Sequence, residues 1–159
     1  MDTLIETNLE RSFLIMDENI NLTILNEISK AAKMGMESIS YVTDKIGDET
    51  MKENLSCQYA GYGEIVEKVN KEFDTYGEIP DEAPVKDKMM SWMGVQMNTM
   101  TDKSNSHIAE ILIQGNTMGV IESRKLINHN PHAEKNVKDI LNEFVTFQEN
   151  NINKMKEFL

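Results

Sequence analysis

The sequence has little cysteine, little proline and no long apolar run. Cys57 is the only cysteine among 159 residues, so no internal disulfide can form, and a single thiol fits a reducing cytoplasm. We expect Cys57 to be an ordinary half-buried helix residue. No stretch reaches the roughly 18 consecutive apolar residues of a membrane span. Asp2 and Glu6 stand where an export signal would be basic. The sequence therefore predicts a cytoplasmic protein.

Positive charge is also scarce. The chain has 16 Lys and Arg against 27 Asp and Glu, a net charge of −11. Binding to nucleic acid requires a clustered Lys/Arg face, and the sequence shows none. An anionic membrane surface is disfavoured for the same reason. We therefore expect neither nucleic acid nor a membrane as a partner.

Several enzyme signatures are missing as well. There is no glycine-rich phosphate loop, no Gly-x-Ser-x-Gly elbow and no zinc-finger spacing. No alternation typical of strands extends over any useful length, which argues against nucleotide-binding α/β folds. The sequence favours a non-catalytic protein over an enzyme, and we expect no cofactor.

What the sequence does contain is four amphipathic stretches of nearly equal length, at 19–46, 49–76, 104–129 and 132–158. In the first two, apolar or aromatic residues recur at spacings of three and four, the pattern of a helical packing face. The face of the first stretch is Leu25, Ile28, Ala32, Gly35, Ile39, Val42 and Ile46. The face of the second is Leu55, Tyr59, Tyr62, Val66, Val69, Phe73 and Tyr76.

Short links join the helices in pairs. Gly47 is expected to end the first helix in a left-handed conformation, and Asp48 to cap the second. Gly77 ends the second helix, and Pro131 is expected to open the fourth at its first position. Ser104, in Thr-Asp-Lys-Ser, is the expected cap of the third. Helices joined by links this short form antiparallel hairpins.

The 77–103 connection is long and carries two prolines and a small helix at about 85–100. A helix of 28 residues is about 42 Å long, and this connection can span that length. The spacing permits a crossover from one end of the bundle to the other, and we favour it. The alternative is a simple up-and-down bundle capped by the small helix.

Residues 1–18 precede the regular pattern. We expect them to form an N-terminal extension to a bundle domain of residues 19–159. Thr3 and Glu6 match a capping box over a short helix that carries Leu9 and Phe13. Met16 is a candidate alternative start.

Three central segments carry a family resemblance: Tyr76-Gly77-Glu78-Ile79-Pro80, Met89-Met90-Ser91-Trp92-Met93-Gly94 and Ser106-His107-Ile108-Ala109-Glu110. With the helix layout, they resemble a bacterial group of uncharacterised ferritin-like bundles over about residues 19–158. The resemblance implies an all-α, ferritin-like four-helix bundle of two antiparallel hairpins joined by a helical crossover. That group has no established activity, so the resemblance implies none here.

Iron-binding ferritin-like proteins need a Glu on each of two helices and a Glu-x-x-His pair on each of the others. The long helices contain no Glu-x-x-His, and only His107-x-x-Glu110 comes close, in reversed order. The simpler interpretation is a polar stripe facing water or another subunit. The alternative is an atypical Fe, Mn or Zn site of His107 and Glu110 with Glu64, Glu143 or Glu149. His129 and His132 flank one turn, where polar composition is the simpler account.

The small helix is rich in methionine, at Met89, Met90, Met93 and Met97 around Trp92. The first interpretation is a helix laid on the bundle. The alternative is an adaptable contact surface for a partner, because methionine side chains repack easily. A thioether copper(I) site is a third option, without support from nearby His or Cys.

The tyrosines of the second helix lie near two mid-helix glycines, Gly61 and Gly63. Such glycines cost about 1 kcal/mol each relative to alanine, which a close helix approach near Tyr62 would offset. A buried tyrosine hydroxyl needs a partner, and Gln148 or Asn151 of the fourth helix could supply it.

Two functional hypotheses follow. The first is a non-catalytic ferritin-like bundle that acts through self-association, as a homo-oligomer, or through contacts with a protein partner. The second is a metal-binding bundle with an atypical site around His107 and Glu110.

Overall fold

A computed structural model describes residues 2–82 and 88–159, with side chains except at 2–4 and 88–90. The described part is helical and contains no strand. Its elements are α1 (Asp2–Thr43), α2 (Glu49–Thr75), α3 (Lys88–Asn98), α4 (Asn105–His129), α5 (Lys135–Met155) and a final 3-10 turn, η1 (Lys156–Phe158). Among these residues, none of the helices has the length and apolar character needed to cross a membrane.

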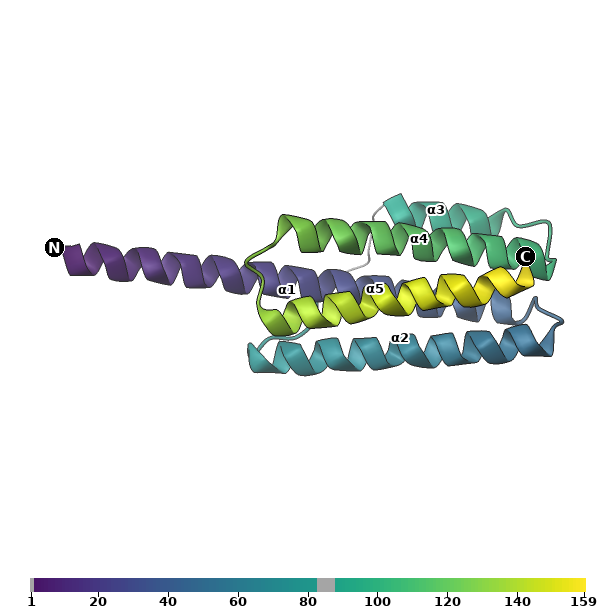
Figure 1. The fold of residues 1–159 in the computed structure, drawn as a ribbon, viewed down its shortest axis with the longest axis horizontal. Coiled ribbons are helices and arrows are strands. Elements are labelled where there is room, and N and C mark those ends of the chain that lie inside the picture. Colours follow the sequence, from purple (N-terminus) through teal and green to yellow (C-terminus); the bar gives the residue numbers. More distant parts are fainter. Residues whose placement is uncertain (1, 83–87) are drawn as a thin grey trace.

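The long helices form two antiparallel hairpins, α1 with α2 and α4 with α5 (Figure 1). The chain leaves α2 at one end of the bundle and enters α4 at the other, and α3 lies along the connection. As a result α2 and α4 run in the same direction. The predicted layout, two hairpins joined by a helical crossover, is confirmed.

The predicted packing face of α1 is confirmed. Its apolar side chains are all 4% exposed or less, and Gly35 is half-buried among them. The predicted face of α2 is wrong at two positions. Tyr59 is 41% exposed and Gln58 is buried in its place, and Val66 is half-buried while Ile65 beside it is buried. The buried positions of α2 follow the spacing 55, 58, 62, 65, 69 and 73. Residue identity favoured the tyrosine, but the helical period selects the neighbouring glutamine.

Two of the predicted helix caps are confirmed. Asp48 Oδ1 accepts a hydrogen bond from Met51 N at 2.8 Å, and Ser104 Oγ accepts one from His107 N at 3.2 Å. These bonds satisfy backbone N–H groups that the first turns of α2 and α4 leave free.

Of three helix boundaries predicted at particular residues, one is confirmed and two are wrong. Gly47 does not provide a left-handed stop, because α1 ends at Thr43 and the only positive φ among described glycines is 66° at Gly77. Gly77 therefore ends α2 as expected. Pro131 does not open the last helix: it lies in the turn before α5, where Ala133 N donates to Asn130 O at 3.1 Å.

Helix α1 is longer than the sequence pattern predicted. The short separate helix expected within residues 1–18 is instead the first part of one continuous helix of 42 residues. In Figure 1 this part extends well beyond the ends of the other helices. The capping box involves Thr3, whose side chain lies outside the described ones. The division into an extension of residues 1–18 and a domain of residues 19–159 stays a prediction.

The bundle proper begins near Asn21 of α1. The Asn21 side chain is fully buried, and its Oδ1 accepts a hydrogen bond from Glu134 N at 2.9 Å, next to the start of α5. Five residues on, Asn26 Oδ1 accepts one from Asp81 N at 2.8 Å. These two amides attach the α4–α5 turn and the start of the crossover to α1.

Helices α1 and α2 approach each other closely where Gly35 faces Tyr62. A Cβ atom on Gly35 would lie 2.4 Å from Tyr62 Cζ. The Tyr62 ring is also held edge-on by Phe144 and Phe147 of α5, with centroids 6.4 and 4.8 Å away. These contacts restrict movement of the ring away from Gly35. By contrast, nothing lies within 4 Å of a Cβ on Gly63.

We expect Gly35→Ala to lower the free energy of unfolding by about 1–3 kcal/mol, because the added methyl overpacks a rigid site. Gly63→Ala is the matched control and should raise it by about 0.5–1 kcal/mol, because alanine is the better helix former and the position is open. Urea denaturation followed by circular dichroism measures both. Equal effects of the two substitutions would contradict the close approach at Gly35.

Candidate functional site

The centre of the bundle contains a cluster of uncharged polar side chains contributed by all four long helices. Each is 7% exposed or less, and the set combines amides with hydroxyls. We refer to it as the central polar cluster: Ser38, Gln58, Tyr62, Asn116, Gln148 and Asn151.

Hydrogen bonds connect part of this cluster. The Tyr62 hydroxyl donates to Asn116 Oδ1 at 2.9 Å, and Asn116 Nδ2 donates to Leu112 O at 2.9 Å. This partner of Tyr62 comes from α4 and was not predicted from the sequence, whereas Asn151 of α5, one of the two predicted partners, also interacts with the hydroxyl and lowers its pKa. Gln148 Oε1 and Asn151 Nδ2 are buried and have no hydrogen-bond partner within the described part of the chain.

The donor atoms of the central polar cluster do not suit a di-metal centre. Such a centre needs bridging carboxylates and imidazoles, and the cluster contains neither. A cavity of about 30 Å³ beside Tyr62 and Gln148 has room for about one water molecule. Across residues 2–82 and 88–159, no three His, Cys, Asp or Glu side chains gather closely enough to hold a metal ion.

Burial raises the pKa of Tyr62 to about 12, and the nearby amides of Asn151 and Asn116 partly offset that effect. The phenol is therefore protonated throughout the physiological range and acts as a hydrogen-bond donor. Nothing in this site provides a base or a redox partner for it. The chemistry of the cluster is that of a packed polar core.

The proposed ligands His107 and Glu110 lie close together on α4, with His107 Nδ1 and Glu110 Oε2 3.5 Å apart. Glu110 is exposed and also accepts a hydrogen bond from Gln114 Nε2 at 3.3 Å. Glu64 is exposed on α2. The described residues bring together a pair of potential ligands, and a metal site here stays a prediction.

The other carboxylates considered for that site have cationic partners. Glu143 of α5 pairs with Lys68 of α2, and Glu149 Oε1 lies 3.7 Å from Arg124 Nη2 of α4. His129 and His132 are both exposed at the α4–α5 turn.

The methionine-rich helix α3 lies on the bundle. Met93 and Met97 are 9% and 6% exposed, and Trp92 is half-buried. The Tyr41 hydroxyl of α1 donates to Met97 O at 2.9 Å. Met93 and Met97 thus face inward, while the side chains of Met89 and Met90 lie outside the described ones. This placement agrees with a helix laid on the bundle, and a partner contact through α3 stays a prediction.

Cys57 is exposed rather than half-buried, which corrects the expectation from the sequence. It lies on α2 next to the buried Gln58, one position off the face that packs into the bundle.

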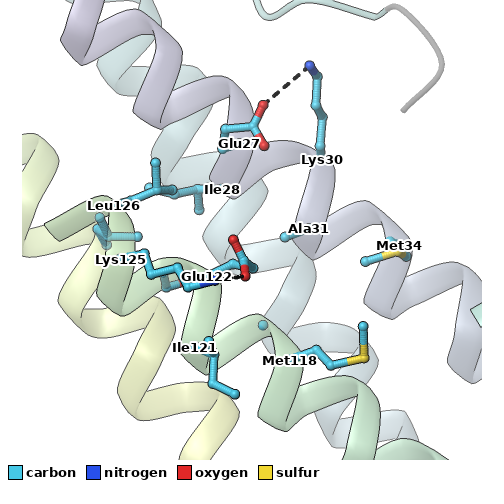
Figure 2. A pocket seen from close by; sticks show the side chains of 13 residues that line it. Glu27, Ile28, Lys30, Ala31, Met34, Met118, Ile121, Glu122, Lys125 and Leu126 are labelled. Atoms are coloured by element: carbon cyan, nitrogen blue, oxygen red, sulfur yellow. Dashed lines mark hydrogen bonds and ion pairs between the residues drawn. The ribbon is translucent and has the colours of Figure 1, made fainter. Parts of the chain in front are cut away.

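Beyond α3, the α1–α4 side of the bundle has an open groove of about 560 Å³ (Figure 2). The rim carries two ion pairs, Glu27–Lys30 at 3.6 Å and Glu122–Lys125 at 2.8 Å. Ile121, in its lining, is 49% exposed. We call it the α1–α4 groove; its apolar lining is Ile28, Ala31, Met34, Met118, Ile121, Leu126 and Leu141.

The part of α1 that extends beyond the bundle exposes large apolar side chains. Each of them is more than half exposed, and four are consecutive in the sequence. We refer to residues 5–16 as the apolar arm; its large apolar residues are Ile5, Leu9, Phe13, Leu14, Ile15 and Met16. Leu9 and Phe13 were predicted from the sequence to lie on one face of a short helix. The run Phe13–Met16, which places apolar side chains on every side of the helix, is the feature from which this exposed segment could have been predicted.

No protein-family model matches the chain, and no curated protein matches it. Two solved structures are similar. YcfI from Rhodopseudomonas palustris, described as a candidate structural protein, has a TM-score of 0.70 at 12% identity, with 88% of this chain and 92% of that chain covered. A dodecameric thioferritin, the bacterioferritin-related protein of Bacteroides fragilis, has a TM-score of 0.70 at 7% identity, with 89% of this chain and 84% of that chain covered.

These likenesses, together with the hairpin–crossover–hairpin topology, show that the chain has the all-α, ferritin-like four-helix fold. The expected resemblance to ferritin-like bundles is confirmed at the level of the fold. At these identities the comparisons establish architecture alone.

The raised pKa of Tyr62 predicts a loss of stability in alkali. Below pH 10 the phenol is protonated in both states; between about pH 10 and 12 only the unfolded chain ionises, so the free energy of unfolding falls by about 2–3 kcal/mol. Tyr62→Phe removes this contribution and costs about 1–2 kcal/mol at neutral pH, because Asn116 Oδ1 loses its donor.

The difference between wild type and Tyr62→Phe should therefore shrink between about pH 8 and pH 11.5 in urea denaturation. The exposed Tyr59 provides the control substitution, Tyr59→Phe. A constant difference across this range would contradict a buried, protonated Tyr62.

Proposed function

We propose that this protein is a non-catalytic ferritin-like bundle that works through self-association. The observation that carries the proposal is the apolar arm, and above all the run Phe13–Met16, in which every side chain is at least 60% exposed. A helix that is apolar all round is normally buried against other protein. In one copy of the chain, these side chains face solvent.

The composition of the bundle centre supports the non-catalytic part of the proposal. Amides and a protonated tyrosine lie in the bundle core, the region in which ferritin-like enzymes build their metal centre. The chain resembles one protein described as dodecameric and another described as a candidate structural protein. Both descriptions are in line with a role in assembly.

A membrane surface is a poor alternative partner for the arm. Helices that lie on anionic membranes carry Lys and Arg on their polar face. The arm has Glu6 and Glu10 and a single cation, Arg11, with Asp17 and Glu18 directly after it. A protein partner, and first of all another copy of this chain, suits the arm better.

The double substitution Leu9→Glu with Phe13→Glu should convert the purified protein from an oligomer into a monomer. Each buried apolar side chain contributes about 1.5–3 kcal/mol, so the loss of two weakens association by at least about a hundredfold. Native mass spectrometry and light scattering measure the change. Ile79→Glu, at an 83% exposed loop position, is the control and should leave the mass unchanged. A wild-type protein that is monomeric at micromolar concentration would refute the proposal.

Metal binding around His107 and Glu110 is the second candidate function, supported by their 3.5 Å approach. It predicts about one metal ion per chain when untagged protein is prepared with Fe, Mn or Zn, and loss of that metal in His107→Ala and in Glu110→Ala. His129→Ala with His132→Ala is the control for adventitious binding at the exposed turn. Metal content that is substoichiometric, or that follows the control, would remove this candidate.

A further inference from the structure

The chain contains both an exposed apolar helix segment and an open apolar groove. Among the residues that the structure describes, the large apolar side chains of the arm are each more than half exposed, and no described helix lies in the α1–α4 groove. We infer that the α1–α4 groove of one copy receives the apolar arm, residues 5–16, of a second copy. The inference rests on the proposed self-association and specifies its two surfaces.

The fold already provides an example of a helix bound on this side of the bundle. α3 packs against both α1 and α4, and a Cβ on Gly115 would lie only 2.6 Å from Met93 Cε. The α1–α4 groove begins where this contact ends, since its α4 lining starts at Met118. The arm would thus continue the layer of helix that α3 begins.

The lengths agree. The α4 surface beyond the α3 contact runs from Met118 to the end of the helix at His129, which is twelve residues or about 18 Å. The twelve residues of the apolar arm form about 18 Å of helix, which fits that space.

The arm cannot fill the groove of its own copy. The groove is lined by Ile28, Ala31 and Met34 of α1, the same continuous helix that carries the arm. Folding back would require α1 to break between residues 17 and 26, in the region where Asn21 and Asn26 hold the neighbouring turns. The arm is therefore available only to another molecule (Figure 1).

Charge favours the groove over a symmetric pairing of two arms. Two paired arms would bring Glu6 and Glu10 of both copies together, with Arg11 as the only cation on each. The rim of the groove instead offers Lys30 and Lys125. Each lysine pairs with a glutamate of the lining, so the charged residues that line the groove sum to zero; Lys30 also lies 3.9 Å from Asp81, which stands outside the lining.

Such a contact joins two different surfaces, so the copy at each end of an open chain retains a free arm or a free groove until the chain closes into a ring. Head-to-tail contacts of this kind build closed rings or open filaments, whereas a symmetric contact stops at a dimer. The inference therefore predicts either an open chain of copies or a closed assembly, the smallest of which is a dimer that exchanges both arms.

A mixing experiment tests the two surfaces. One variant carries Leu9→Glu and Phe13→Glu in the arm; the other carries Ile121→Glu in the groove, at a position already 49% exposed and therefore compatible with folding. Each variant alone should be monomeric by native mass spectrometry. An equimolar mixture should form a 1:1 heterodimer, because it contains one intact arm and one intact groove. Val95→Glu, at an exposed position of α3, is the control and should assemble like wild type.

The outcomes separate the inference from the proposed function. Wild-type protein that is monomeric would refute self-association itself. Wild-type oligomers that persist in Ile121→Glu but dissociate in the arm variant would overturn the groove and indicate symmetric pairing of arms. Oligomers that persist in both variants would place the interface elsewhere. Heterodimers in the mixture, with monomers in each separate sample, are the result expected from docking of an arm into a groove.

Discussion

The packing of Tyr62 at the centre of the bundle determines how the long helices fit together. Its ring lies against Gly35 of α1 and between two phenylalanines of α5, and its hydroxyl reaches Asn116 of α4. One side chain of α2 therefore contacts the other three long helices. A larger residue in place of Gly35 would separate α1 from α2, and loss of the hydroxyl would leave a buried amide oxygen without a donor. Most of the other buried side chains are apolar and follow the helical period around this point; Asn21, Ser29 and Ser123 are buried polar residues outside the cluster.

The central polar cluster distinguishes this chain from metal-containing bundles of the same fold, because its side chains differ in chemistry from metal ligands. In metal-containing bundles, inward carboxylates repel one another unless cations compensate them. Here amides and a protonated phenol take the inward polar positions, and such groups need only hydrogen bonds. Two of the amide atoms, Gln148 Oε1 and Asn151 Nδ2, have no hydrogen-bond partner among the described residues. The adjoining cavity has the volume of about one water molecule, a group able to satisfy such atoms.

Helix number, hairpin pairing and crossover were predictable from the sequence because they depend on periodicity, caps and chain length. The errors have physical causes at individual residues. Tyr59 was preferred to Gln58 because an aromatic residue looks like core, although the period places the glutamine inside. Pro131 fits both a first helical turn and a preceding loop, and local sequence does not distinguish them. The role of Asn116 depends on the offset between α2 and α4, which no local pattern encodes. The continuity of α1 was missed because Leu14 and Ile15 interrupt the apolar face that Ile5, Leu9 and Phe13 begin, so the regular spacing starts only after this segment.

The hydrogen bond between Asn21 and Glu134 links the projecting part of α1 to the far hairpin. Asn21 lies where α1 enters the bundle, and its side chain binds the backbone next to the start of α5. Because α1 is one unbroken helix, a force applied at its outer end is transmitted along the helix to this hydrogen bond. Mechanical load on the arm would thus reach the α4–α5 turn directly, without first unfolding α1 or passing through α2.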